Sequence, residues 1–356
     1  MSDRAKELHE QAVVVDGHNH IMMELSKRRN RGDKGVFSNY YAPLILKGGV
    51  NVLMTNVGGD NTCLTNDSDL MLWGSLWVMD MLREEAEESR DILTICLNCK
   101  DMDAALAQGK IAVFLTMEGG RPLEGKPNLD NLVGLRTFYR FGLRALQLVD
   151  NGRNRIGDGK GETRTRGGLT NFGICVVKEM NRLGMIIDVA HLTEPGFWDV
   201  IEASEDPIID SHSNARRVCD HPRNLTDEQI KAIAKGGGVI GLSSHVSLIS
   251  KETDKPTIDD LIKHVDHIVG LVGIDHIGLG PDHTEFEMEI NQWSPAPGWL
   301  EGVFYGVRDT YFIEGLNNVT EFPQYTEALV KRGYPDEDIK KILGQNFLRV
   351  YRQVIG

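Results

Sequence analysis

Eight short apolar runs, separated by helical patterns, limit the possible folds of this chain more than any other feature of its sequence. Two of them, Ile111–Leu115 and Met185–Val189, are almost continuously apolar, as strands of a parallel sheet covered on both faces are. Because parallel strands need a crossover between them, this alternation predicts consecutive right-handed βα units. The strands are predicted at residues 12–17, 49–57, 111–117, 143–149, 185–190, 207–211, 238–243 and 275–280.

The helical patterns carry recognisable start and stop signals. Pro195 follows Thr193 at a good helix start, and Thr226–Gln229 has the spacing of a capping box. Gly236–Gly238 is typical of a helix end, since a phosphate loop would need its glycines after a strand. Helices are predicted from Thr193 and near residues 68–89, 171–183, 229–235, 257–271, 324–332 and 336–351.

Eight βα units suffice to close a (β/α)8 TIM barrel, so we predict one α/β barrel domain over residues 1–356. The active site of this fold is built from loops at the C-terminal ends of the strands. Long loops predicted near residues 21–43, 150–170 and 283–311 would surround that mouth. The alternative is an open doubly wound sheet, but the sequence lacks the glycine-rich dinucleotide fingerprint of that fold.

Composition and charge narrow the classes of partner. The chain has 39 Lys and Arg against 52 Asp and Glu, and this net charge of −13 argues against nucleic acid. No stretch approaches about 18 apolar residues, so we expect no membrane span. Residues 1–7 lack the apolar core of a signal peptide, which favours the cytoplasm. Five cysteines are an odd count that argues against a disulfide framework, and the lone pair Cys96 and Cys99 is interpreted as structural.

The first predicted strand ends in the most informative chemistry. The run Val13–His20 stops at two histidines one residue apart, His18 and His20. Because alternate residues on a strand face the same way, both can reach one metal. Glu118 follows the third strand and precedes two glycines, so it can lie against a metal pair and bridge it. Each feature alone is also compatible with ordinary structural residues.

Later strand ends supply further ligands. His191 and His212 follow the strands at 185–190 and 207–211, and Asp282 follows the last strand. Neutral imidazole and carboxylate suit Zn²⁺ and related ions, so the set predicts two metals bridged by Glu118. A metal pair can lower the pKa of a shared water and polarise a carbonyl. Asp282 could accept the proton of that water and pass it to a leaving amine.

Basic residues near the same mouth indicate anion recognition. Arg223 could bind a carboxylate with two hydrogen bonds, although a surface arginine before a helix is the simpler interpretation. The glycine-rich loop Gly152–Gly168 could recognise an anion, act as a mobile lid or simply be solvated. Its basic residues are Arg153, Arg155, Lys160, Arg164 and Arg166.

With these motifs the sequence resembles the membrane (renal) dipeptidase family, the M19 peptidases of the amidohydrolase superfamily. The resemblance implies a (β/α)8 barrel of the metal-dependent hydrolase type with two zinc ions. It also implies that Arg223 binds the substrate carboxylate and that Asp282 handles the proton. The matching motifs run in order over nearly the whole chain: Asp16–Asn19, Glu118–Gly120, Asp188 with His191, Ser211–Ser213, His221–Asn224, Gly278–Asp282 and Ile342–Val350.

The resemblance also divides the metal ligands between two ions. By position, His18, His20 and Glu118 hold one ion, and Glu118, His191 and His212 hold the other. His20 stands where the family usually has an aspartate, which restores the His-x-His pattern of the wider superfamily. Metal binding is therefore expected to survive, with a change in the preferred metal or its occupancy.

A second departure concerns the substrate. Asp150 stands where the family has a histidine that helps to hold the substrate carbonyl. A carboxylate there would repel a developing oxyanion. Either Arg153 or Arg155 takes over that role, or the substrate differs, or Asp150 recognises an amino group.

The prediction is a zinc-dependent dipeptidase in which a metal-bridging hydroxide attacks the amide bond of a small dipeptide, including one with a C-terminal D-residue. One alternative keeps the metals but acts on an N-acyl amino acid, a cyclic amide or a modified metabolite. Another is a non-hydrolytic tailoring or binding protein on the same scaffold. The resemblance is also consistent with a homodimer.

Overall fold

A ring of eight parallel strands forms the centre of the molecule, and each strand is hydrogen-bonded to the next in the order β1-β2-β4-β5-β6-β7-β8-β9. The computed structural model describes residues 1–60, 71–124, 132–162, 164–165, 167–253, 255–283 and 312–356. The eight strands lie where the sequence predicts them: β1 (Val14–Asn19), β2 (Val50–Gly59), β4 (Ile111–Glu118), β5 (Leu143–Gln147), β6 (Ile186–Asp188), β7 (Ile209–Asp210), β8 (Val239–Leu242) and β9 (Ile277–Leu279).

Backbone contacts beyond β9 nearly close this ring onto β1. The amide of His20 donates to the carbonyl of His283 at 3.0 Å, and the amide of Asp282 donates to the carbonyl of His18 at 3.2 Å. The predicted (β/α)8 barrel is therefore confirmed. A short strand absent from the prediction, β3 (Leu93–Ile95), pairs with β4 outside the ring.

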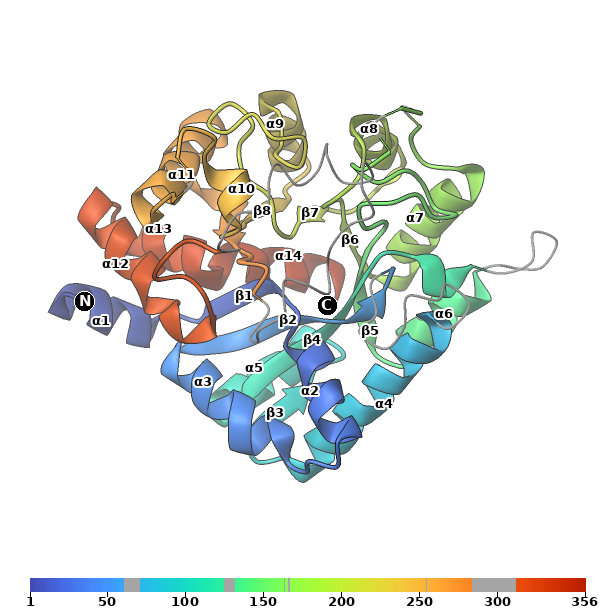
Figure 1. Cartoon of the computed structure of the whole chain (residues 1–356), viewed down its shortest axis with the longest axis horizontal. Helices are drawn as coiled ribbons and strands as arrows, with labels where there is room; N and C mark the ends of the chain where they lie inside the picture. The colour runs from blue at the N-terminus through green and yellow to red at the C-terminus, as the bar shows by residue number, and fades with distance from the viewer. Residues whose placement is uncertain (61–70, 125–131, 163, 166, 254, 284–311) are drawn as a thin grey trace.

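Helices surround the strands and cover their outer face (Figure 1). The helix starts predicted from the sequence are confirmed at two helices. Thr226 and Gln229 form the capping box of α9, and Thr193 caps α8 with Pro195 in its first turn. The helices are α1 (Asp3–Gln11), α2 (Ile21–Asn30), α3 (Ala42–Lys47), α4 (Met71–Glu88), α5 (Cys99–Ala107), α6 (Val133–Arg140), α7 (Asn171–Leu183), α8 (Glu194–Ala203), α9 (Asp227–Lys235), α10 (Val246–Ile249), α11 (Ile258–Val272), α12 (Pro323–Arg332), α13 (Asp336–Lys340) and α14 (Asn346–Val354).

Two predicted segments differ in the structure. Where the sequence predicts a long loop near residues 21–43, the chain forms α2 and a π-helical turn at Phe37–Tyr41 that leads into α3. The buried carboxylate of Glu85 on α4 accepts the amides of Val36 and Phe37, which anchors this segment. The helix predicted at 336–351 is divided into α13 and α14 by a π-helical turn at Lys341–Gln345. Most of the predicted 283–311 loop lies outside the described residues.

The barrel interior is packed on the side of α14. Inward residues of the strands, such as Val15, Val52 and Phe114, form one apolar cluster with Phe347 and Tyr351 of that helix. The Phe347 ring lies so close to β1 and β9 that a Cβ on Gly17 or Gly278 would approach it within 2.6 Å. Only glycine fits at these positions, and polar chemistry is left to the C-terminal strand ends.

Four of the five cysteines lie in the described residues, and all four are free thiols, as predicted. In that part of the chain, no helix combines the length and the apolar character needed to cross a membrane.

Candidate metal centre

Four imidazoles converge on one carboxylate at the C-terminal ends of β1, β4, β6 and β7. The Nε2 atoms of His18, His20, His191 and His212 lie 3.8, 3.5, 3.5 and 3.9 Å from the nearest oxygen of Glu118. All five side chains are buried. The structure therefore brings together every ligand that the sequence predicts.

The two oxygens of Glu118 face different histidines. Oε2 is the nearer oxygen to His20, whereas Oε1 is the nearer one to His18, His191 and His212. Two triplets of ligand atoms share Glu118, namely His18–His20–Glu118 and Glu118–His191–His212, each within 4.8 Å. This division matches the one that the family resemblance implies, and a carboxylate between two triplets can bridge two ions.

Hydrogen bonds to the outer ring nitrogens prepare two of the histidines for a metal. His191 Nδ1 lies 2.9 Å from Asn151 Oδ1 and 3.2 Å from Asp150 Oδ1, both acceptors. The proton of the neutral ring therefore sits on Nδ1, and the lone pair of Nε2 points toward Glu118. His212 Nδ1 lies 2.7 Å from Ser211 Oγ. The donor set and its orientation fit zinc or a similar divalent ion.

Neutral amides hold the Glu118 carboxylate in place. Asn56 Nδ2 donates to Oε2 and Gln147 Nε2 donates to Oε1, each at 3.2 Å. Neither amide was identified from the sequence. The available signal was an amide side chain near the C-terminal end of a predicted strand, Asn56 in β2 and Gln147 in β5.

The backbone is strained at two residues of this centre. His191 and Asp282 adopt positive φ angles of 67° and 68° without being glycine. Asp188 accepts the amides of Ala190 and Ser211, each at 3.0 Å, and so joins the turn that carries His191 to the end of β7. Asp188 is thus a structural support rather than a ligand.

Burial dominates the electrostatics of the centre. It lowers the pKa of His18 to about 3 and holds the pKa values of His191 and His212 well below the usual range. It also raises the pKa of Glu118 to about 7. Three of the four histidines are therefore neutral and ready to bind a metal at neutral pH.

His20 and Asp282 behave differently, as an ion pair. His20 Nε2 lies 3.1 Å from Asp282 Oδ1. Burial alone would lower the pKa of His20, but the hydrogen bond to Asp282 and the charge of Glu118 raise it to about 9. Burial likewise opposes ionisation of Asp282, yet its bond to His20 lowers its pKa to about 2. A metal must displace the proton of His20 to bind there.

Asp282 is the predicted proton carrier and the most accessible carboxylate of the centre. Its side chain is 26% exposed, against 6% for Glu118. Its Oδ1 also lies 3.6 Å from His18 Nε2. It can therefore exchange a proton with a molecule that enters beside the ligands.

The predicted substrate-binding residues have three different surroundings. Arg223 is buried beside the ligands, where it donates to the carbonyl of His212 at 3.1 Å and to Ser213 Oγ at 3.2 Å. Asp150 contacts His191 Nδ1, and burial together with the charge of Glu118 raises its pKa to about 7. The Arg153 side chain is 52% exposed and pairs with Asp158, so the structure does not bring it to the ligands.

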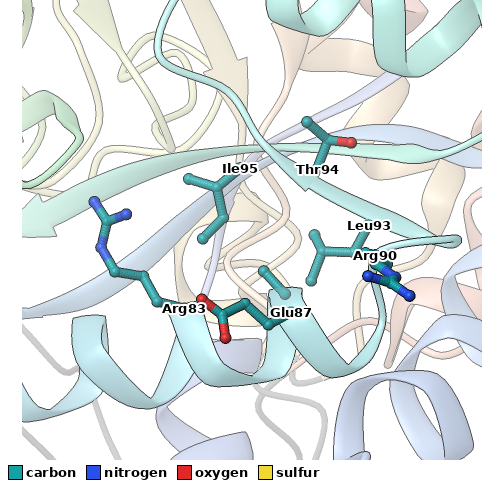
Figure 2. Close-up of a pocket in the computed structure, with 7 residues that line it drawn as sticks. Arg83, Glu87, Arg90, Leu93, Thr94 and Ile95 are labelled. Atoms are coloured by element: carbon teal, nitrogen blue, oxygen red, sulfur yellow. The ribbon is translucent and has the colours of Figure 1, made fainter.

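A separate hollow of about 530 Å³ lies between α4 and β3, away from these strand ends. Figure 2 shows basic and acidic side chains of α4 beside the residues of β3. None of the predicted site residues lines it; its lining is Arg83, Ala86, Glu87, Arg90, Leu93, Thr94 and Ile95.

Comparisons with known proteins agree with this geometry. The sequence model of the membrane dipeptidase family, peptidase family M19, matches residues 2–297 and 302–355. The chain is 29% identical over 293 residues to the "Uncharacterized protein in pqqA 5'region" of Klebsiella pneumoniae, which covers 80% of this chain and 96% of that protein. It is 30% identical over 279 residues to Dipeptidase verJ of Clonostachys rogersoniana, which covers 78% of this chain but 64% of that protein. A crystal structure of an amidohydrolase from Pseudomonas aeruginosa superposes with a TM-score of 0.82 at 26% identity, over 99% of each chain.

Proposed function

The chain belongs to the membrane dipeptidase family, peptidase family M19, and from this premise we propose that it hydrolyses the amide bond of a small dipeptide with a free carboxylate. Membership makes it a metal-dependent hydrolase. One observation carries the proposal for its substrate: four imidazoles and Glu118 converge beside Arg223, a buried cation suited to a carboxylate. The curated relative Dipeptidase verJ, by its name, supports the same reaction class.

The proposed cofactor is a pair of zinc ions, held by His18, His20 and Glu118 on one side and by Glu118, His191 and His212 on the other. Two such ions would supply Lewis acidity, which lowers the pKa of water and polarises an amide carbonyl. The protein contributes the orientation of the ligands, since Glu118 is held by two amides and His191 by Asn151 and Asp150.

Arg223 and Asp282 would act on the substrate itself. The guanidinium of Arg223 is held by its hydrogen bonds to His212 and Ser213. It can therefore hold a carboxylate at a constant distance from the proposed ligands. Asp282 would accept the proton of the attacking water at Oδ1 and return it to the leaving amine. Its lowered pKa keeps it ionised and able to accept that proton.

The test is amine release from a dipeptide library that covers both configurations of the C-terminal residue. The protein is reconstituted with zinc, and its metal content is measured. Cleavage of a defined set supports the proposal, whereas silence across the library with metal bound contradicts it. Arg223→Met is expected to raise KM about tenfold or more for dipeptides with a free carboxylate, because a charge-assisted pair contributes roughly 1.5–3 kcal/mol. C-terminally amidated dipeptides should not show this increase.

A second candidate function keeps the metals but changes the amide to that of an N-acyl amino acid. Asp150 favours it, because this carboxylate stands where the family has a histidine that helps to hold the substrate carbonyl. The Asp150 side chain is 17% exposed and lies against His191. N-acetyl amino acids belong in the same assay. Their cleavage in preference to every dipeptide would establish this alternative.

A further inference from the structure

Lys160 is a buried cation that the proposed mechanism does not use. Lys160 is only 8% exposed to solvent. Its amide donates to the carbonyl of His191 at 2.8 Å, and the neighbouring Gly159 forms a bridge with Leu192. The loop after β5 is therefore tied to the loop that carries a proposed metal ligand, and the backbone at Lys160 has a fixed position relative to that centre.

The other described basic residues of the loop Gly152–Gly168 have different surroundings. Arg153 pairs with Asp158, and Arg155 lies over the ring of Phe172 at 4.4 Å. Arg164 is exposed, and Arg166 lies outside the described residues. Among the basic residues of this loop that are described, Lys160 is the one that is buried.

The charges around Lys160 do not balance it. Across the described residues, the ammonium group has no hydrogen-bond or ion-pair partner. The charged groups that act on it are Arg216 and Arg223, which repel it, and Asp210 and Glu194, which attract it. The charge of Asp210 also acts on Arg223. The Glu194 side chain is 53% exposed and lies near Arg216, so neither acid acts on Lys160 alone.

The position of Lys160 suits an incoming anion. Lys160 is buried next to the strand ends and lies among more positive charge than its neighbours offset. An anion bound between Lys160 and Arg223 would offset the repulsion between these two cations. Two cations in a weakly solvated site attract an anion far more strongly than they would at an exposed surface.

We propose that Lys160 and Arg223 form a two-cation subsite that selects dipeptides whose C-terminal residue has an acidic side chain. Arg223 binds the main-chain carboxylate with its planar fork, and Lys160 binds the side-chain carboxylate as a point charge. The inference rests on the proposed function, because it assigns Arg223 to the C-terminal carboxylate.

The competing interpretation is that Lys160 only compensates the buried charge of Asp210. The two interpretations differ in one measurable quantity, the ratio of kcat/KM for acidic over isosteric neutral substrates. A compensating lysine would affect both substrates equally. A lysine that binds the side-chain carboxylate affects the acidic one alone.

The experiment uses the zinc-loaded enzyme and the matched pairs Ala-Glu with Ala-Gln and Ala-Asp with Ala-Asn, each with an L or D second residue. We expect the enzyme to prefer the acidic member of at least one pair about tenfold or more in kcat/KM. Lys160→Met should bring this ratio to about one, mainly through KM. Arg164→Met removes a positive charge from the same loop and should leave the ratio as it is. An equal rate for both members in the unmodified enzyme, or an undiminished ratio in Lys160→Met, would overturn the inference.

Calorimetric titration with free glutamate and glutamine provides a measurement that needs no turnover. Glutamate should bind the zinc-loaded protein about tenfold more tightly than glutamine, and Lys160→Gln should remove this difference. Equal affinities in the unmodified protein would refute the subsite. If no dipeptide is cleaved but glutamate is preferred, the proposed reaction fails and the anion subsite stands; if neutral dipeptides are cleaved and acidic ones are not preferred, the subsite alone fails.

Discussion

The proposed metal ligands and the loop that follows β5 lie against each other at the mouth of the barrel, but they are fixed by different means. The ligands come from strand ends, where the register of the sheet sets the direction of each side chain. The loop residues depend on individual contacts, such as the bond from Lys160 to the carbonyl of His191. Polar residues in these two regions are therefore not equally informative in the sequence. A residue at a strand end has a predictable position in the fold, whereas for a basic loop residue only the charge is predictable.

Removing the shared ligand should have the largest effect on the metal side of this comparison. Glu118→Gln takes away the charge that faces all four imidazoles, so we expect both metals to be lost and kcat/KM to fall by about 10³ or more. Metal analysis after gel filtration, together with dipeptide hydrolysis, measures both effects. Glu205→Gln, an exposed exchange of the same type, is the control. A variant that kept two metals and its activity would disprove the bridging role.

The next largest effect is expected at Asp282. Asp282→Asn preserves the shape of the side chain but cannot accept a proton, so kcat should fall about 10²- to 10⁴-fold while the metal content stays the same. Full activity of this variant would show that another group handles the proton.

Variants of Asp150 test whether the loop after β5 contributes to metal binding. Because Asp150 lies beside His191 Nδ1, Asp150→Ala should weaken metal binding about 10- to 100-fold. Asp150→Asn, which keeps an oxygen acceptor, should recover part of this affinity. Competition with a chelating indicator gives the values. Unchanged metal affinity with a higher KM for dipeptides than for N-acyl substrates would instead assign Asp150 to the substrate amino group.

The last prediction is a pH dependence of metal binding, which is about tenfold for each pH unit. A metal ligand must be a neutral imidazole, and the raised pKa of His20, about 9, keeps this ring protonated at neutral pH in the metal-free protein. Apparent zinc affinity should therefore rise about tenfold per pH unit between roughly pH 7 and 9 and level off above. Below about pH 7, protonation of Glu118 should steepen the dependence. His20→Asp, which introduces the residue usual in the family, should flatten the slope between pH 7 and 9. A flat profile in the unmodified protein would contradict the His20–Asp282 ion pair.

The barrel and the residues proposed as metal ligands follow from the sequence alone. Apolar runs separated by helical patterns leave few ways to bury both faces of a parallel sheet, and alternation along β1 directs His18 and His20 to one side. Because active residues of a barrel gather at C-terminal strand ends, Glu118, His191 and His212 could be identified without coordinates.

Only the tertiary structure decided what surrounds these ligands. It gave Glu118 its amide partners Asn56 and Gln147, joined Asp150 to His191, and left Arg153 paired with Asp158 away from the metal centre. It also buried Lys160 beside Arg223. Strand residues inherit their direction from a regular period, so a pattern in the sequence is sufficient to orient them. Loop residues have no such period, and their roles follow from contacts between segments far apart in the chain, which exist only once the barrel has closed.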